Sequence, residues 1–172
     1  MERKIDESHP LWGFLSETLS ESLEDRLLMR GVEDVREYLA AMLVDFLSYE
    51  GIYRLRNSQG QVVKSLSEML AEADVRLEAN SFDREREVHQ HIGDFLLFWS
   101  GLFPECLDSI AIGPNHAEAQ GKQSYYVVST FEFGRYADDA PVFKKLSEGF
   151  DDFQEGLRLV RKRMPGLKPF QS

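Results

Sequence analysis

One segment of the sequence, residues 88–102, constrains the fold of this chain more than any other. It reads VHQHIGDFLLFWSGL, and all five residues from 95 to 99 are apolar. Because an α-helix turns by about 100° per residue, these five side chains cover its whole circumference. A helix that is apolar on every side is enclosed by other elements. The segment therefore predicts a central helix, over about residues 82–102, with the rest of the chain packed around it.

Amphipathic segments lie on both sides of this central helix. Apolar residues spaced three and four apart predict helices over about residues 10–29 and 32–49, from residue 66 through Leu77, and over about 114–133 and 140–164. Residues 51–64 interrupt the pattern and predict a short hairpin or a plain crossover loop around Asn57 to Gly60. The expected fold is all-α: a compact bundle of five to seven helices around the central one.

Local signals predict several helix ends. Gly31 is expected to stop the first helix, and Ser65 with Glu68 three residues later matches a capping box at the start of the third. Ser81 is expected to begin the central helix. The run YYVV at 125–128 has strand propensity. A helix is nevertheless favoured there, because helical spacing is kept by Ala117, Gly121, Tyr125 and Val128.

Two further patterns concern packing. The last helix carries an apolar stripe with near-heptad spacing that must pack on this chain or on another copy: Val142, Leu146, Phe150, Phe153, Leu157 and Val160. Gly93 and Gly121 fall inside predicted helices, where glycine costs about 1 kcal/mol relative to alanine. We expect these glycines to mark a close crossing of the helix at 82–102 with the helix at 114–133.

Size and composition indicate one domain. The 172 residues, 42% hydrophobic and 29% charged, predict a single helical domain over 1–172, with a flexible C-terminal tail at 165–172. The net charge of −10 repels nucleic-acid phosphates and anionic membrane surfaces, so neither is an expected partner. The only basic cluster, within residues 158–168, is expected to complement the dipole at a helix C-terminus.

The single cysteine, Cys106, excludes an intrachain disulfide and indicates a cytoplasmic protein. Its apolar neighbours favour a small buried residue over a nucleophile. No stretch reaches the ~18 apolar residues that a membrane-spanning helix needs. The sequence contains no glycine-rich phosphate loop, no nucleophile elbow and no cysteine cluster, so no cofactor is expected and enzymatic classes are not favoured.

Two histidines among carboxylates, His89 and His91, raise the question of a metal site. They are two residues apart, so they point to opposite sides of one helix and cannot both bind the same ion. Metal sites in helical bundles use Glu-x-x-His motifs from two helices. Here Glu87 precedes His91 by four residues, and no second helix offers a matching pair. The sequence therefore predicts no metal.

His91 is expected at the edge of the buried face, and three roles for it remain open. It can be a boundary histidine bonded to Glu87, Asp94 or a backbone carbonyl, or a pH-sensitive contact with a partner. It can also be an acid–base residue that Asp94 holds in a pocket beside Tyr125. The candidate ligand-binding residues are therefore Glu87, His91, Asp94 and Tyr125.

Several short motifs resemble a group of uncharacterised bacterial helical proteins. They are His91-Ile92-Gly93-Asp94 with the apolar run after it, Gly101-Leu102-Phe103-Pro104-Glu105, and Gly121 with Tyr125, followed by an amphipathic C-terminal helix. The resemblance covers about residues 88–155. It implies an all-helical fold and carries no activity.

The function that these patterns favour is non-enzymatic: a cytoplasmic helical interaction or structural protein that self-associates or binds a protein partner. Dense aromatic stripes and the lack of a catalytic constellation support this hypothesis. The alternative is a small-molecule-binding or enzymatic helical bundle with a pocket near His91 and Asp94. A nucleic-acid contact through the basic C-terminal turn is a third hypothesis.

Overall fold

The computed structural model describes residues 8–24 and 32–169. Within these ranges the chain forms eight α-helices, seven of them at least eight residues long: α1 (Pro10–Glu24), α2 (Glu33–Phe46), α3 (Tyr49–Ile52), α4 (Leu66–Ala73), α5 (Phe82–Leu102), α6 (Pro114–Ser129), α7 (Ala140–Glu148) and α8 (Phe150–Arg163). Short 3-10 helices follow α5 and α6: η1 (Pro104–Cys106), η2 (Asp108–Ile110) and η3 (Gly134–Tyr136). The described residues form no β-strand, so the predicted all-α fold is confirmed.

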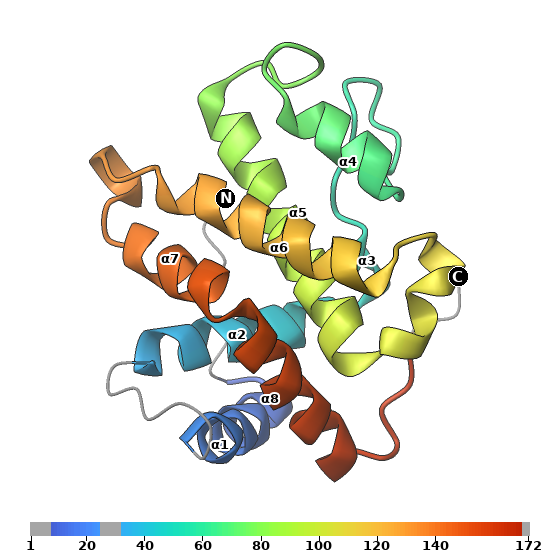
Figure 1. Cartoon of the computed structure of the whole chain (residues 1–172), viewed down its shortest axis with the longest axis vertical. Coiled ribbons are helices and arrows are strands. Elements are labelled where there is room, and N and C mark those ends of the chain that lie inside the picture. The colour runs from blue at the N-terminus through green and yellow to red at the C-terminus, as the bar shows by residue number, and fades with distance from the viewer. Residues whose placement is uncertain (1–7, 25–31, 170–172) are drawn as a thin grey trace.

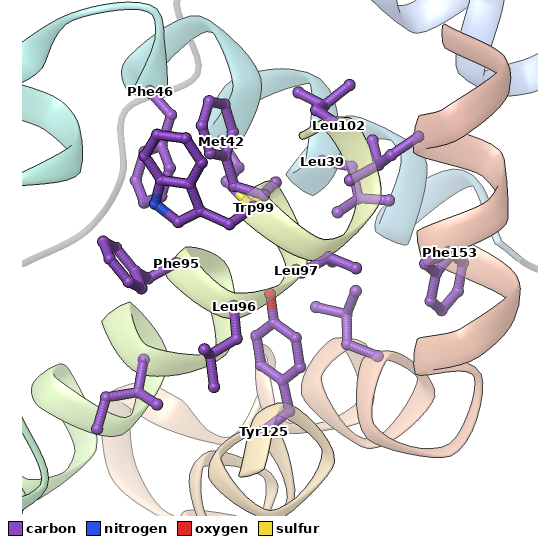
Figure 2. Packing of buried hydrophobic residues seen from close by; sticks show 14 of the residues in the cluster. Leu39, Met42, Phe46, Phe95, Leu96, Leu97, Trp99, Leu102, Tyr125 and Phe153 are labelled. Atoms are coloured by element: carbon purple, nitrogen blue, oxygen red, sulfur yellow. The ribbon is translucent and has the colours of Figure 1, made fainter. Parts of the chain in front are cut away.

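Helix α5 lies at the centre of the molecule, as its sequence predicts (Figure 1). Every residue from 90 to 103 is buried, and α5 packs against α6, α8, α4 and α2. In Figure 2 the side chains of Phe95, Leu96, Leu97 and Trp99 leave α5 in different directions and meet residues of its neighbours. Burying a large apolar side chain stabilises a fold by about 2 kcal/mol. The fully apolar stretch of α5 is therefore the centre of the hydrophobic core.

Side-chain caps start α4 and α5 where the sequence predicts them. Ser65 Oγ accepts from the backbone N–H of Glu68, whose carboxylate accepts from the backbone N–H of Ser65, so the capping box is confirmed. Ser81 Oγ accepts from the backbone N–H of Arg84 at 3.1 Å. Helix α1 begins at Pro10 as expected, but its predicted end near Met29 and the stop at Gly31 lie outside the described residues.

Helix α4 is shorter than predicted. It ends at Ala73, because Asp74 is extended and its carboxylate accepts from the guanidinium and the backbone N–H of Arg76. The hydrogen bonds from the guanidinium, and to a smaller extent the one from the backbone N–H, lower the pKa of Asp74 to about 2. Leu77 was expected on the buried face of this helix. It lies instead in the turn that follows, 67% exposed.

Of the two alternatives for residues 51–64, the structure shows the short hairpin, over residues 55–63. After the single turn of α3, Arg56 and Val62 make an isolated antiparallel bridge. The backbone N–H of Gly60 donates to the carbonyl of Asn57 at 2.9 Å, and Gly60 has a φ of +77°, a conformation that glycine adopts without strain. The turn residues in the sequence thus mark a real turn.

The ambiguous YYVV run is helical. Helix α6 continues through it to Ser129, and its predicted buried face is confirmed: Ala117, Gly121, Tyr125 and Val128 are all buried. The expected end near Phe133 is wrong, because the chain tightens into a turn in which the N–H of Thr130 donates to the carbonyl of Val127.

The predicted last helix is divided at Gly149 into α7 and α8. Gly149 has φ −104° and ψ 21°, outside the helical region, and so breaks the helix. The apolar stripe is nevertheless buried from Leu146 to Val160, and α8 packs against α1 and α5 of its own chain. Within the segment predicted as a flexible tail, Leu167 packs partly buried against the core.

The two helical glycines both lie at close helix contacts, but with different neighbours. A Cβ atom on Gly93 would lie 2.6 Å from the ring of Tyr125, which confirms the close crossing of α5 and α6. A Cβ atom on Gly121 would lie 2.3 Å from the ring of Phe150. The expectation that Gly121 also marks the α5–α6 crossing is therefore wrong, since its nearest neighbour belongs to α8.

Candidate functional site

The carboxyl group of Asp94 lies at the centre of the candidate site. Tyr38 on α2 donates its hydroxyl to both oxygens of this group, at 2.8 and 2.9 Å, and Tyr125 on α6 donates to Oδ1 at 2.8 Å. Figure 2 shows the Tyr125 ring rising from α6 with its hydroxyl directed at α5. Asp94 and Tyr125 have no exposed surface. One buried carboxyl group therefore joins α2, α5 and α6.

Two more polar residues of α5 extend this group toward the surface. Gln90 donates from Nε2 to the Tyr38 hydroxyl at 3.1 Å and accepts from Arg86 Nη1 at 3.4 Å. Arg86, Gln90 and Asp94 are four residues apart, so they form one polar stripe along the helix. We call these three residues, with Tyr38 and Tyr125, the polar stripe network.

Arg86 is the outer end of the polar stripe network. Its guanidinium lies 4.0 Å from the ring centre of Tyr136, and Nη2 is 3.9 Å from a carboxylate oxygen of Asp139. Burial lowers the pKa of Arg86 from its ordinary value, and the nearby Tyr136 and Asp139 oppose that shift. The aromatic face and the carboxylate together offset part of the cost of burying a cation.

His91 lies in an aromatic environment inside the core. Its ring centre is 5.7 Å from that of Phe46 and 6.1 Å from that of Phe95, and the residue has no exposed surface. The expectation that His91 lies at the edge of the buried face is therefore wrong. Phe46 on α2 covers the side of His91 that was expected to lie at the edge of the buried face. The local sequence of α5 does not specify where α2 lies.

Glu87 points to a different part of the molecule. Its partly exposed carboxylate accepts from Arg84 Nη1 at 3.4 Å. Arg84 also donates to the buried Glu72 of α4 at 3.0 Å and to the carbonyl of Arg56 in the hairpin at 2.7 Å. Of the four candidate residues, the structure brings Asp94 and Tyr125 into hydrogen-bond contact and places Glu87 in this separate surface group.

His89 faces α6. Its Nδ1 is 3.2 Å from Ser124 Oγ, which also accepts from Gln120 Nε2 at 3.1 Å. Burial lowers the pKa of His89 below the ordinary value of 6.5, and the charge of Asp74 opposes the shift. His89 and His91 thus lie in separate surroundings, one against α6 and one against α2.

Tyr38, Gln90 and Arg86 were not among the residues expected at this site. The spacing of Arg86, Gln90 and Asp94 was a usable signal, because three polar residues four apart share one face of a largely apolar helix. Tyr38 carries no such signal. It lies 56 residues from Asp94 in the sequence, and only the packing of α2 on α5 brings the two together.

The geometry suits support of the fold better than reaction with a substrate. Asp94, Tyr125 and His91 are closed off from solvent, and the hydroxyl donors already occupy the carboxyl oxygens. Among the described residues, no cluster of three or more histidine, cysteine or acidic side chains could hold a metal ion. None of the described helices combines the length and apolar character needed to cross a membrane.

A small, partly enclosed apolar pocket has room for about one water molecule. Its lining comes from α1, α2, α5, α8 and the segment after α8: Leu15, Leu43, Leu47, Phe98, Leu102, Val160, Met164 and Leu167.

Comparison with known proteins adds no assignment. The chain matches no protein-family model, no curated protein and no solved structure. The resemblance to bacterial helical proteins therefore stays a prediction.

Proposed function

We propose that this chain is a non-enzymatic helical interaction protein that self-associates, and that it acts in the cytoplasm. The proposal is supported by two exposed aromatic side chains. Phe82 at the start of α5 is 69% exposed, and Phe133 before η3 is 65% exposed. Large aromatic side chains are enriched at the energetic centres of protein interfaces. Burial of each one on association is worth about 1.5–3 kcal/mol.

Contacts between α5 and η3 hold the surface around Phe133 in place. The hydroxyl of Tyr136 donates to Asp83 at 2.5 Å, and Arg135 Nη2 is 3.6 Å from the same carboxylate. The ring of Phe133 packs 5.8 Å from that of the buried Phe131. We call Asp83, Phe133, Arg135 and Tyr136 the η3 surface. A fixed aromatic surface loses little conformational entropy when a partner binds.

The alternative of a ligand pocket near His91 and Asp94 has less support. Both residues have no exposed surface, and the tyrosine hydroxyls hold the carboxyl group of Asp94. A small molecule would have to displace one of these helices to reach them. The cytoplasmic location rests on the single cysteine, Cys106, which excludes intrachain disulfides.

Sedimentation velocity over a wide concentration range tests the proposal. The wild type should gain mass with concentration, and Phe133→Ser should weaken the association by about tenfold or more, because an aromatic anchor is lost. Leu77→Ser is the matched control, since Leu77 is similarly exposed at 67% but lies in the α4–α5 turn. A wild type that stays monomeric at every concentration, or an equal effect of both variants, contradicts the proposal.

A further inference from the structure

Arg86 keeps a charged group almost entirely inside the protein with few hydrogen bonds. The residue is 6% exposed. Nη1 donates to Gln90 Oε1 at 3.4 Å, which is long for a hydrogen bond. Nε is buried and has no hydrogen-bond partner among the described residues. Buried cations are normally paired and hydrogen-bonded, so the structure leaves donors of Arg86 unused.

The unused donors lie on one edge of the guanidinium. Nε and Nη2 share the edge that can bind one carboxylate or phosphate group through two parallel hydrogen bonds. The carboxylate oxygen of Asp139 next to Nη2 is 3.9 Å away, which is too far for a hydrogen bond. This edge therefore faces an acidic group without bonding to it.

Asp139, the N-cap residue of α7, is a weak occupant of this place. Its side chain is 58% exposed and accepts no hydrogen bond from the backbone of the first turn of α7. Its backbone is held, since its N–H donates to the carbonyl of Tyr136 and its carbonyl accepts from the N–H of Val142. The carboxylate can therefore turn into solvent while the chain stays in place, and this turn would uncover the edge of Arg86.

Aromatic rings hold the guanidinium in position. Its central carbon lies 4.0 Å from the ring centre of Tyr136, in the η3 surface, and 5.5 Å from that of Phe143 on α7. The hydroxyl of Tyr136 donates to Asp83 and accepts from Arg135 Nη2 at 2.7 Å. A cation that is held by rings on its face keeps its edge for a ligand and loses little freedom when the ligand binds.

The other charges near this edge oppose an anion only weakly. The N-terminus of α7 has no side-chain cap and carries a positive partial charge. The carboxylate of Asp83 is 3.6 Å from Arg135 Nη2, and this pairing offsets its charge. Asp139 is the remaining acid in contact with Arg86, and its carboxylate occupies the place that an anion would take.

We propose that the Nε–Nη2 edge of Arg86 and the first turn of α7 bind a small oxyanion, a carboxylate or phosphate group, in exchange for the carboxylate of Asp139. A free oxyanion is not tethered to the chain, so it can approach Nη2 to the distance of a charge-assisted hydrogen bond, about 2.7–2.9 Å. It also supplies Nε with an acceptor. The site goes beyond the proposed self-association and is independent of it, since none of its contacts needs a second copy.

Titration with inorganic phosphate and with acetate, at constant ionic strength, tests the site by NMR. The Nε–H resonance of Arg86 should shift until the site is saturated, because Nε gains an acceptor. Asp139→Asn should tighten binding by about three- to tenfold, since a negative charge beside the ligand is removed. A tighter complex with phosphate than with acetate assigns the ligand a phosphate group, and the reverse assigns it a carboxylate.

Arg86→Lys tests whether the two-nitrogen edge matters. Lysine keeps the positive charge but cannot form two parallel hydrogen bonds to one oxyanion, so binding should weaken by about tenfold or more. The backbone N–H resonance of Ala140, in the first turn of α7, reports binding in this variant. Arg76→Met is the control, because Arg76 is an exposed arginine in the α4–α5 turn and should leave binding unchanged.

The outcomes decide for or against the site. Saturable binding that tightens in Asp139→Asn and weakens in Arg86→Lys supports it. A lack of saturation with both anions, or an Asp139→Asn protein that binds no more tightly than the wild type, overturns it. Equal weakening in Arg86→Lys and Arg76→Met also overturns it, because the anions would then respond to overall charge. Sedimentation velocity measures self-association separately, so either result leaves the proposed function standing.

Discussion

The hydroxyl of Tyr38 donates to both carboxyl oxygens of Asp94, across a sequence separation of 56 residues. With Tyr125 as a second donor, this carboxyl group links α2, α5 and α6 inside an otherwise apolar core. A buried polar group is tolerated only where its hydrogen bonds are made. The pairing therefore favours one arrangement of the three helices over others that bury similar apolar surface.

Tyr38→Phe removes a hydroxyl donor and keeps the aromatic ring. We expect it to lower the free energy of unfolding by about 1–3 kcal/mol, since Asp94 loses a buried hydrogen-bond donor. Urea denaturation measures the change. Tyr126→Phe is the matched control, because Tyr126 is an exposed tyrosine of α6 and should change stability by less than about 0.5 kcal/mol. Similar losses in the two variants would contradict a specific role for the Tyr38–Asp94 bond.

Gly93→Ala and Gly13→Ala should have opposite effects on stability. At Gly93 the new Cβ would lie 2.6 Å from the Tyr125 ring, so α5 and α6 must separate, at a cost of about 1–3 kcal/mol. At Gly13 in α1 the Cβ meets nothing within 4 Å, and alanine should stabilise the helix by about 0.5–1 kcal/mol. Thermal unfolding of both variants checks the signs. A stabilised Gly93→Ala protein would disprove the tight crossing.

Arg84→Met should loosen the connection between the hairpin, α4 and α5. Arg84 Nη2 bonds to Glu72 and to the carbonyl of Arg56, and its loss leaves the buried carboxylate of Glu72 without this partner. We expect about 2 kcal/mol of destabilisation and faster hydrogen exchange at the backbone N–H of Val63, which bonds to Leu55 in the hairpin.

Arg76→Met is the control for this prediction, because the Arg76 side chain is 86% exposed in its pair with Asp74. Exposed ion pairs contribute about 0–1 kcal/mol, so its effect on stability should be small. Unchanged exchange at Val63 in the Arg84→Met protein would show that Arg84 does not hold the hairpin.

His89 should make the protein less stable below neutral pH. Burial holds its pKa in the folded state below 6.5, so as the pH falls from about 6.5 the unfolded chain binds a proton that the folded protein does not. The stability contributed by the neutral imidazole is fully present above pH 6.5, the pKa in the unfolded chain. It is lost as the pH falls to the lower pKa of the folded protein. In His89→Gln this dependence disappears. The urea midpoints of wild type and variant at pH 8 and pH 5 measure this dependence. An equal change of the midpoint between the two pH values in both proteins would contradict the prediction.

The candidate site could be predicted only in part. Asp94 and Tyr125 were expected to lie together, and they do. The close approach of α5 and α6 at Gly93 was also expected. The burial of His91 under Phe46 and the position of Glu87 beside Arg84 were not. Both depend on which neighbouring element covers which side of α5, and the periodicity of a helix contains no information about its neighbours.

The sequence by itself determined where most of the helices lie, most of their buried faces and the central position of α5. These properties follow from local spacing: residues 95–99 are apolar on every side, and Ser65 with Glu68 caps α4. Only the tertiary structure decided which residues meet. Tyr38 reaches Asp94, and Gly121 meets Phe150, because several helices must share one core volume. That choice depends on the combined packing of side chains distant in sequence, which no local pattern encodes.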